Sequence, residues 1–332
     1  MSVPNQSLGY VGWAAETFEV RIGPLISSLS GEILPGVDAN LWLETCGPGP
    51  TAETRFRLFP GSFFLLWIEA FAGAEASRGA EPLAAAIELL HNATLVHDDV
   101  LDSHTIRKGQ ATMNSRFGRA LALLGGDGLY SAALCVMSRV SSERSPGALL
   151  RLGQATQDVV AAQILDEPER WAHVPLRERW MYWLAVCRGK LALGNLGGPL
   201  AAFWVGQESL EKPVRELLTE YSIVSQVLND FGDLLGLAGY QVRAPSLRSP
   251  GEESRQKPTL PLIWSGCEQL VDLHPMSQLL ARAQGEVAER KARALERLRP
   301  LPLAEPALSR LQDFFVCPSL PCAGKVPHER CL

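Results

Sequence analysis

Helical periodicity is the feature of this sequence that most restricts its fold. Six long segments are rich in alanine and leucine and repeat their apolar residues at helical spacing: 61–96, 119–141, 149–168, 177–205, 213–238 and 277–298. Alternating runs of β-branched residues are nearly absent, and no GxGxxG or GxxxxGKS/T motif occurs. The sequence therefore predicts an all-α fold. We expect a single-domain bundle of long helices around a central cavity over residues 1–316, and a loose C-terminal tail over 317–332.

Charge and hydropathy exclude several function classes. The 332 residues carry a net charge of −5, so no overall basic field favours binding to nucleic acid. The first residues lack the basic start and apolar run of a secretory signal, and the most membrane-like stretch, 191–206, is shorter than a span requires. Seven scattered cysteines without a CxxC pair are typical of a reduced, cytoplasmic protein. We expect no nucleic-acid partner and no stable membrane insertion.

The stretch LVHDDVLDSHTIRKG, residues 95–109, combines three aspartates with a basic pair. If it is helical, Asp98 and Asp102 stand on one face with their Cβ atoms about 5–6 Å apart. Carboxylates that close repel each other unless a cation lies between them. Arg107 and Lys108 follow a little more than one turn later, where they would meet an anionic group near the same metal. A solvated acidic face followed by a helix end is the alternative interpretation of this stretch alone.

A second acidic stretch, QVLNDFGDLLG at 226–236, repeats this spacing with Asn229, Asp230 and Asp233. Two such clusters on long apolar helices indicate the facing walls of one cavity. Because burying unpaired carboxylates is very costly, a hidden pair of clusters implies bound cations. Carboxylate oxygens are ligands that Mg²⁺ prefers, whereas thiolate and imidazole ligands in zinc spacing are missing.

The sequence also resembles a known family. The stretch IELLHNATLVHDDVLDSHTIRKGQATMNSRFGRALALLGGDGL is similar to the first aspartate-rich region of the trans-isoprenyl diphosphate synthases. QVLNDFGDL is similar to the second aspartate-rich motif of that family, and QKPTLPLI (256–263) to its GKPTLPL segment. The resemblance runs from about residue 50 to residue 300. It implies an isoprenoid synthase type of fold and an enzyme that joins an allylic diphosphate to isopentenyl diphosphate.

The resemblance further implies a Mg²⁺-dependent mechanism. Mg²⁺ ions would bridge the allylic diphosphate and neutralise it as the carbon–oxygen bond breaks. The allylic cation would then meet the double bond of isopentenyl diphosphate, and a proton would pass to the released pyrophosphate. No protein nucleophile is needed. The implied metal ligands are Asp98, Asp99, Asp102, Asn229, Asp230 and Asp233.

Other site residues follow from the resemblance, position by position. The residues expected to bind the allylic diphosphate are Arg107, Lys190, Gln226, Arg248 and Lys257. Those expected to act in catalysis are Asp98, Asp102, Arg107, Lys190 and Lys257. Those expected to bind isopentenyl diphosphate are Arg55, His91 and Lys108. Gln163 and Asp166 match polar positions that line the cavity. Taken singly, His91 is more often a core histidine, Lys190 a helix cap and Gln163 an exposed residue.

Product length and assembly are also expectations from the family. Ala93 and Thr94 precede Asp98 by five and four residues, where bulky aromatic side chains stop chain growth early. Small residues there favour a product of C20 or longer, unless Tyr130 or Trp183 forms a floor deeper in the pocket. The resemblance also implies a homodimer.

Three departures from the family keep alternatives open. Thr54 stands where a lysine helps to hold isopentenyl diphosphate, Asn229 replaces an acidic metal ligand, and Leu191 follows Lys190 where threonine is usual. A terpene synthase that acts on an allylic diphosphate alone is therefore the main rival. The full cyclase motif is absent, because Asp233 and Leu237 occupy its later positions. A non-catalytic subunit of a heteromeric synthase is the third possibility, although the first aspartate motif is intact.

Overall fold

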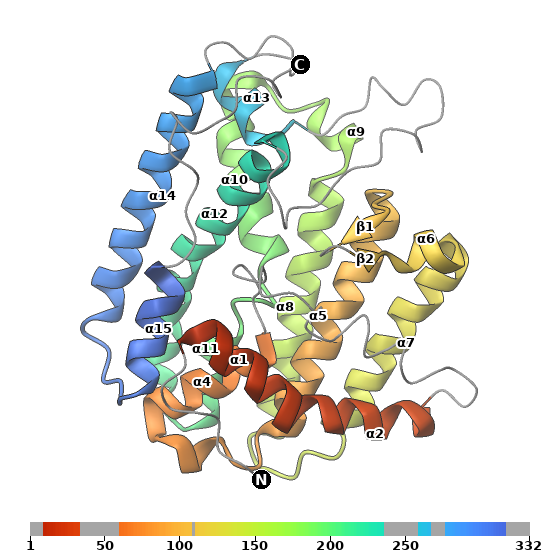
Figure 1. The fold of residues 1–332 in the computed structure, drawn as a ribbon, viewed down its shortest axis with the longest axis vertical. Coiled ribbons are helices and arrows are strands. Elements are labelled where there is room, and N and C mark those ends of the chain that lie inside the picture. Colours follow the sequence, from red (N-terminus) through yellow and green to blue (C-terminus); the bar gives the residue numbers. More distant parts are fainter. Residues whose placement is uncertain (1–8, 34–59, 108–109, 236–257, 267–275, 317–332) are drawn as a thin grey trace.

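The structure, a computed structural model, describes residues 9–33, 60–107, 110–235, 258–266 and 276–316 (Figure 1). The longer helices are α1 (Tyr10–Thr17), α2 (Gly23–Ile33), α4 (Pro60–Ala72), α5 (Glu81–Leu101), α7 (Arg119–Met137), α8 (Ser145–Leu165), α10 (Arg179–Lys190), α11 (Gly197–Trp204), α12 (Glu211–Leu235), α14 (Met276–Leu298) and α15 (Ala307–Val316). The shorter ones are η1 (Phe18–Ile22), η2 (Ala74–Ser77), α6 (Met113–Phe117), α9 (Pro168–Trp171), η3 (Leu176–Glu178), η4 (Glu208–Leu210) and α13 (Leu260–Ser265).

The chain folds as the all-α bundle that its periodicity predicts. In the part that the structure describes, the strands are the two-residue β1 (Ile106–Arg107) and β2 (Gln110–Ala111), which pair antiparallel with Arg107 opposite Gln110. Helix α5 packs along α7, α8 along α10, and α12 along α14 (Figure 1). Helix α10 also packs against α12, so four helices, α5, α8, α10 and α12, follow one another around the molecule.

Helix α4 is the most deeply buried helix of this bundle. Its side chains from Phe63 to Ile68 are all removed from solvent, which matches a helix that is apolar on every side. Gly61 lets α4 approach α5, because a Cβ atom there would stand 2.4 Å from the carbonyl oxygen of Ala84. The Gly61 N–H donates to Glu88 at 3.0 Å across the same contact. Burial of this face fixes the position of α5.

Helix α7 is the one described helix long and apolar enough to cross a membrane by length and composition. Its 19 residues include a window with mean hydropathy 1.6, of which 39% is buried. One face of α7 packs on α5, and the other exposes Leu121, Leu124 and Leu134. The stretch 191–206, which the sequence singles out as membrane-like, is a turn followed by the short helix α11.

Two of the six expected helical segments are wrong as continuous helices. The segment 61–96 is broken between α4 and α5, where Gly73 and Gly79 adopt positive φ angles of 83° and 84°. The segment 177–205 is broken by the turn between α10 and α11. Helices α1, α2 and α15 were not among the expected segments. The expected tail, 317–332, lies outside the described residues.

Candidate active site

The first acidic cluster lies at the C-terminal end of α5. The Asp102 N–H donates to the Asp98 carbonyl at 2.8 Å, so the two residues are one helical turn apart, as the spacing predicts. The helix stops there because Ser103 turns to a left-handed φ of 53°, a conformation that commonly ends helices. This turn sends the chain back as β1, and β1 carries Arg107 to the aspartates.

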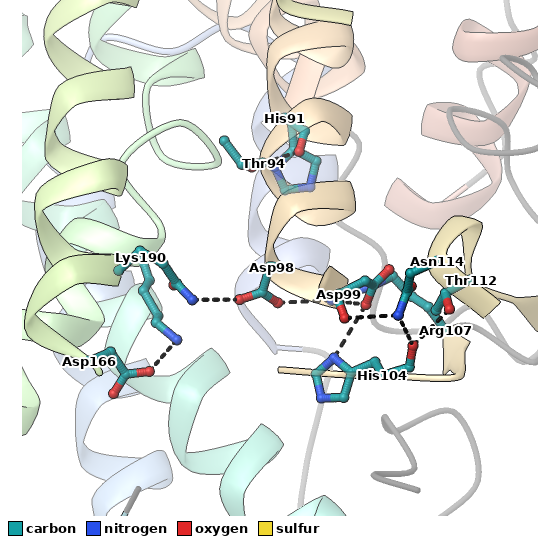
Figure 2. A network of polar contacts seen from close by, with 11 residues as sticks. His91, Thr94, Asp98, Asp99, His104, Arg107, Thr112, Asn114, Asp166 and Lys190 are labelled. Carbon is teal, nitrogen blue, oxygen red and sulfur yellow. Dashed lines mark hydrogen bonds and ion pairs between the residues drawn. The ribbon is translucent and has the colours of Figure 1, made fainter. Parts of the chain in front are cut away.

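Arg107 bridges two of these aspartates (Figure 2). Its Nε donates to Asp99 Oδ1 at 2.8 Å and its Nη2 to Asp98 Oδ2 at 2.9 Å. Burial disfavours the guanidinium charge, yet the neighbouring Asp98 and Asp99 raise the pKa of Arg107. The cation is therefore permanent, and its side chain is held at the end of α5 by two charge-assisted hydrogen bonds.

Asp99 is buried and also faces His104, whose Nδ1 lies 3.2 Å from Asp99 Oδ1 (Figure 2). The His104 carbonyl accepts from Thr112 Oγ1 at 2.7 Å and from Asn114 Nδ2 at 3.1 Å. These bonds close the base of the β1–β2 hairpin. Sequence reasoning missed His104, Thr112 and Asn114, because single polar residues in the turn after α5 and at the start of the short helix α6 give no signal of their own.

Helices α8 and α10 bring further groups to the first cluster. Gln163 Nε2 on α8 donates to Asp98 Oδ1 at 3.2 Å, and Lys190 on α10 forms an ion pair with Asp166 (Figure 2). Gly189 permits this approach, since a Cβ atom there would meet Ala162 Cβ at 2.5 Å.

The ammonium group of Lys190 stays charged in this setting. Burial alone would lower the pKa of Lys190, but the carboxylates of Asp166, Asp98 and Asp102 outweigh it and raise the pKa. Lys190 is the last residue of α10, yet its side chain pairs with a carboxylate rather than serving only as a helix cap. Lys190, Gln163 and Asp166 are thus brought together with Asp98, as the family positions imply.

The second acidic cluster lies near the end of α12. Asp230 Oδ2 accepts from Trp183 Nε1 at 3.1 Å and from the Leu260 N–H at 2.8 Å. Asp230 Oδ1 accepts from Gln226 Nε2 at 3.1 Å. Asn229 is exposed beside it. Asp233 lies in the last turn of α12, and its side chain is outside the described part.

Helix α10 connects the two clusters. Trp183, Cys187 and Lys190 lie on one face of it, because they are spaced four and three residues apart. Trp183 contacts Asp230, and Lys190 lies next to the first cluster. Burial and the charges of Asp230 and Asp166 raise the pKa of the Cys187 thiol well above its ordinary value. The two acidic clusters therefore converge on the same face of α10.

The remaining expected residues fall into two groups. On α5, Ala93 is buried, and Thr94 is half-buried and donates to the His91 carbonyl at 2.7 Å. Trp183 lies at the acidic end of the site, so the idea that it floors the product pocket is wrong. The Tyr130 ring packs 5.7 Å from His97. The expected residues outside the described part are Thr54, Arg55, Lys108, Arg248 and Lys257.

The donor atoms that converge here fit Mg²⁺. Asp98, Asp102 and Asp230 offer carboxylate oxygens from α5 and α12, and hard oxygen ligands of this kind suit Mg²⁺ rather than a softer metal. Asp98 and Asp99, with His104, form a group whose possible ligand atoms lie within 4.8 Å of one another. Arg107 and Lys190 supply fixed positive charge beside these oxygens. The arrangement can therefore hold a metal ion together with an anion such as a diphosphate.

A helical bundle with two acidic clusters at the ends of long helices defines an all-α isoprenoid synthase fold. A geranylgeranyl pyrophosphate synthetase from Geoglobus acetivorans superposes with a TM-score of 0.67 at 21% identity, covering 90% of this chain and 98% of its own. A polyprenyl synthetase from Streptomyces coelicolor also gives 0.67, at 18% identity, with coverage of 91% and 98%. At these identities the likeness shows the fold.

Residues 58–241 match the model of the polyprenyl synthetase family. A (2E,6E)-farnesyl diphosphate synthase from Mycobacterium tuberculosis is 31% identical over 265 residues, covering 79% of this chain and 71% of its own. The chain belongs to the polyprenyl synthetase family. A short chain isoprenyl diphosphate synthase from Methanocaldococcus jannaschii is 32% identical over 161 residues, and this match spans 47% of each chain.

Proposed function

We propose that the protein is a Mg²⁺-dependent prenyltransferase that condenses an allylic diphosphate with isopentenyl diphosphate. The observation that carries this proposal is the meeting of carboxylates and permanent cations at one place. Asp98 lies within hydrogen-bond distance of Arg107 and Gln163, and Lys190 stands beside it. A metal–diphosphate complex needs both kinds of group, because the metal takes oxygen ligands and the phosphate oxygens accept from cationic donors.

In this proposal each cluster has a defined task. Mg²⁺ would neutralise the charge that develops on the diphosphate as it leaves. Asp98, Asp102 and Asp230 would hold the metal, with Asn229 and Asp233 beside them. Arg107 and Lys190 would bind phosphate oxygens, together with Gln226, Arg248 and Lys257. Asp99 would hold Arg107 in place through the hydrogen bond seen in the structure.

The second substrate and the product length complete the proposal. Isopentenyl diphosphate would be bound by Arg55, His91 and Lys108. The growing chain would run along α5 past Thr94 and Ala93, whose side chains are small. Because neither forms a floor, we propose a product of C20 or longer.

A terpene synthase is the second candidate function, and Asn229 favours it. An amide oxygen can coordinate Mg²⁺ but carries no charge, so the second cluster binds a cation less strongly than a fully acidic motif would. An enzyme of that kind would ionise an allylic diphosphate and release a hydrocarbon or an alcohol without isopentenyl diphosphate.

A product assay separates the two functions. The purified protein is incubated with Mg²⁺ and farnesyl diphosphate, with and without isopentenyl diphosphate. Longer diphosphates that form only with isopentenyl diphosphate support the elongating synthase and give its chain length. A hydrocarbon or alcohol formed without it supports the terpene synthase. Product that persists with excess chelator would contradict the Mg²⁺ dependence.

We further propose that the protein is a homodimer that buries the exposed face of α7. Leu121, Leu124 and Leu134 are each more than half exposed on this helix, and an exposed apolar face of this kind marks an interaction surface. Sedimentation velocity should give the mass of a dimer. A monomer that co-floats with lipid vesicles would instead assign the same face to a membrane.

A further inference from the structure

Trp183 is a buried tryptophan at the acidic end of the site, and no motif points to a role for it. Its indole Nε1–H donates to Asp230 Oδ2 at 3.1 Å. The ring is only 4% exposed, so water cannot readily replace that acceptor. Leaving a buried indole N–H without a partner costs free energy, and the partner of Trp183 is a carboxylate of the second acidic cluster.

Aromatic neighbours fix the orientation of this indole. Trp183 stacks on Trp180 with ring centroids 5.3 Å apart and planes 14° from parallel. Trp180 lies 5.8 Å from Trp264, and Trp264 lies 6.0 Å from Phe231. Phe231 directly follows Asp230 in α12. These rings form one aromatic cluster: Trp180, Trp183, Trp264 and Phe231. The cluster therefore contains the donor, Trp183, and also the residue next to the acceptor, Asp230.

The Trp183 hydrogen bond belongs to a set of neutral donors around Asp230. The Leu260 N–H donates to the same oxygen, and Gln226 donates to the other. Each of these three donors is neutral, so each fixes the direction of the carboxylate without cancelling its charge. A carboxylate that ligates a metal is commonly oriented by hydrogen bonds of this kind.

We propose that Trp183 is a positioning residue that orients the Asp230 carboxylate toward a Mg²⁺–diphosphate complex. This inference rests on the proposed function, because it requires that complex to bind between the two acidic clusters. It adds a specific requirement, namely that the indole N–H of Trp183, rather than the bulk of its ring, sets the affinity for the metal.

The test compares two variants that make the same chemical change. Trp183→Phe removes the N–H and keeps an aromatic ring, and Trp180→Phe does the same to the stacked partner, which has no hydrogen bond to Asp230 among those described. Calorimetry on the full-length protein measures how binding of inorganic pyrophosphate depends on Mg²⁺ concentration. Circular dichroism and thermal unfolding show whether each variant is folded.

We expect Trp183→Phe to raise the Mg²⁺ concentration for half-maximal pyrophosphate binding by about tenfold or more, the size typical for groups that orient metal ligands. Trp180→Phe should leave it unchanged. Trp183→His places an Nε2–H near the position of the indole nitrogen, so it should recover part of the loss and serves if Trp183→Phe does not fold.

Three results would overturn the inference. Trp183→Phe could bind like the wild type, both phenylalanine variants could shift equally, or Trp183→His could match an equally folded Trp183→Phe. Absence of Mg²⁺-dependent pyrophosphate binding in the wild-type protein is a different outcome. It would overturn the proposed function itself, and the inference with it.

Discussion

The two acidic clusters are held in different ways. In the first, Asp98 and Asp99 face the guanidinium of Arg107, and Lys190 stands close by. In the second, the three donors described at Asp230, those of Trp183, Gln226 and Leu260, are all neutral. The first cluster therefore carries its own positive charge before any ligand arrives. The second orients its carboxylate without such a countercharge among those donors.

This difference gives the clusters different work in the proposed reaction. A cation that bound Asp98 would share that carboxylate with Arg107, whose guanidinium would supply positive charge to an anion bound beside the metal. A cation that bound Asp230 would meet a carboxylate whose direction these three hydrogen bonds already fix. In the proposed reaction the first cluster would couple the metal to the diphosphate, and the second would supply an oriented carboxylate.

The largest effect is expected from a substitution that removes a carboxylate of the first acidic cluster. Asp98→Ala removes an oxygen ligand and one of the two described partners of Arg107. Loss of several kcal/mol of charge stabilisation corresponds to a fall in kcat/KM of about a thousandfold or more. Steady-state kinetics with farnesyl diphosphate measures it. Glu296→Ala, which removes an exposed carboxylate on α14, is the control, and activity of Asp98→Ala within a few-fold of wild type would contradict the metal assignment.

The next largest effect is expected from a substitution that weakens the contact of Arg107 with the two aspartates but keeps its positive charge. Arg107→Lys keeps a cation but cannot bridge Asp98 and Asp99 with a planar fork. Charge-assisted hydrogen bonds contribute about 1.5–3 kcal/mol, so we expect the KM for the allylic diphosphate to rise roughly 10- to 100-fold. Arg299→Lys, at an exposed position after α14, should behave like the wild type. An unchanged KM in Arg107→Lys would show that the bridge is dispensable.

A smaller effect is expected from a substitution that adds a negative charge to the second acidic cluster. Asn229→Asp adds a carboxylate next to Asp230 at an exposed position. One extra charge at about 4 Å is worth about 1 kcal/mol in water, so the Mg²⁺ concentration for half-maximal activity should fall roughly fivefold. Gln278→Glu, which adds the same charge on the exposed face of α14, should leave it unchanged. A higher Mg²⁺ requirement in Asn229→Asp would contradict a role of this position in metal binding.

The smallest expected effect concerns the contribution of Lys190 to the unfolding free energy, which should not change with pH over the neutral and mildly alkaline range. The carboxylates around Lys190 raise its pKa above the ordinary 10.5. A raised folded-state pKa gives a stabilisation that is fully present below the unfolded value and is lost as pH rises through the folded one. The difference in unfolding free energy between wild type and Lys190→Met should therefore be constant from about pH 7 to pH 10. Denaturant titrations measure this difference in unfolding free energy. A difference that already becomes smaller as the pH is raised from 7 to about 9 would contradict the raised pKa of Lys190.

Sequence reasoning predicted the fold class because the helical period repeats over long segments. It failed at the breaks, because apolar residues continue through buried turns such as the one between α10 and α11. Within that turn Leu193 and Leu196 are buried, so periodicity does not distinguish the turn from helix. The first helices, α1 and α2, were not predicted, because they are only 8 and 11 residues long and lie outside the long segments with a repeated helical period.

The site was predictable where function depends on spacing within one helix. Asp98 and Asp102 are one turn apart in both sequence and structure. Partners from other elements were not predictable. Asp230 lies 47 residues from Trp183, and no motif near Trp183 indicates a contact between them. The contact of His104 with Asp99 was not predicted for a related reason, because it depends on the left-handed turn at Ser103.

The exposed leucines of α7 also bear on how stability should be measured. If two copies cover Leu121, Leu124 and Leu134, the folded state is bimolecular and unfolding releases two chains. Mass action then makes the thermal midpoint rise with protein concentration. A melting temperature for this protein would therefore have meaning only together with the concentration at which it was recorded, and dilution alone would act as a mild denaturant.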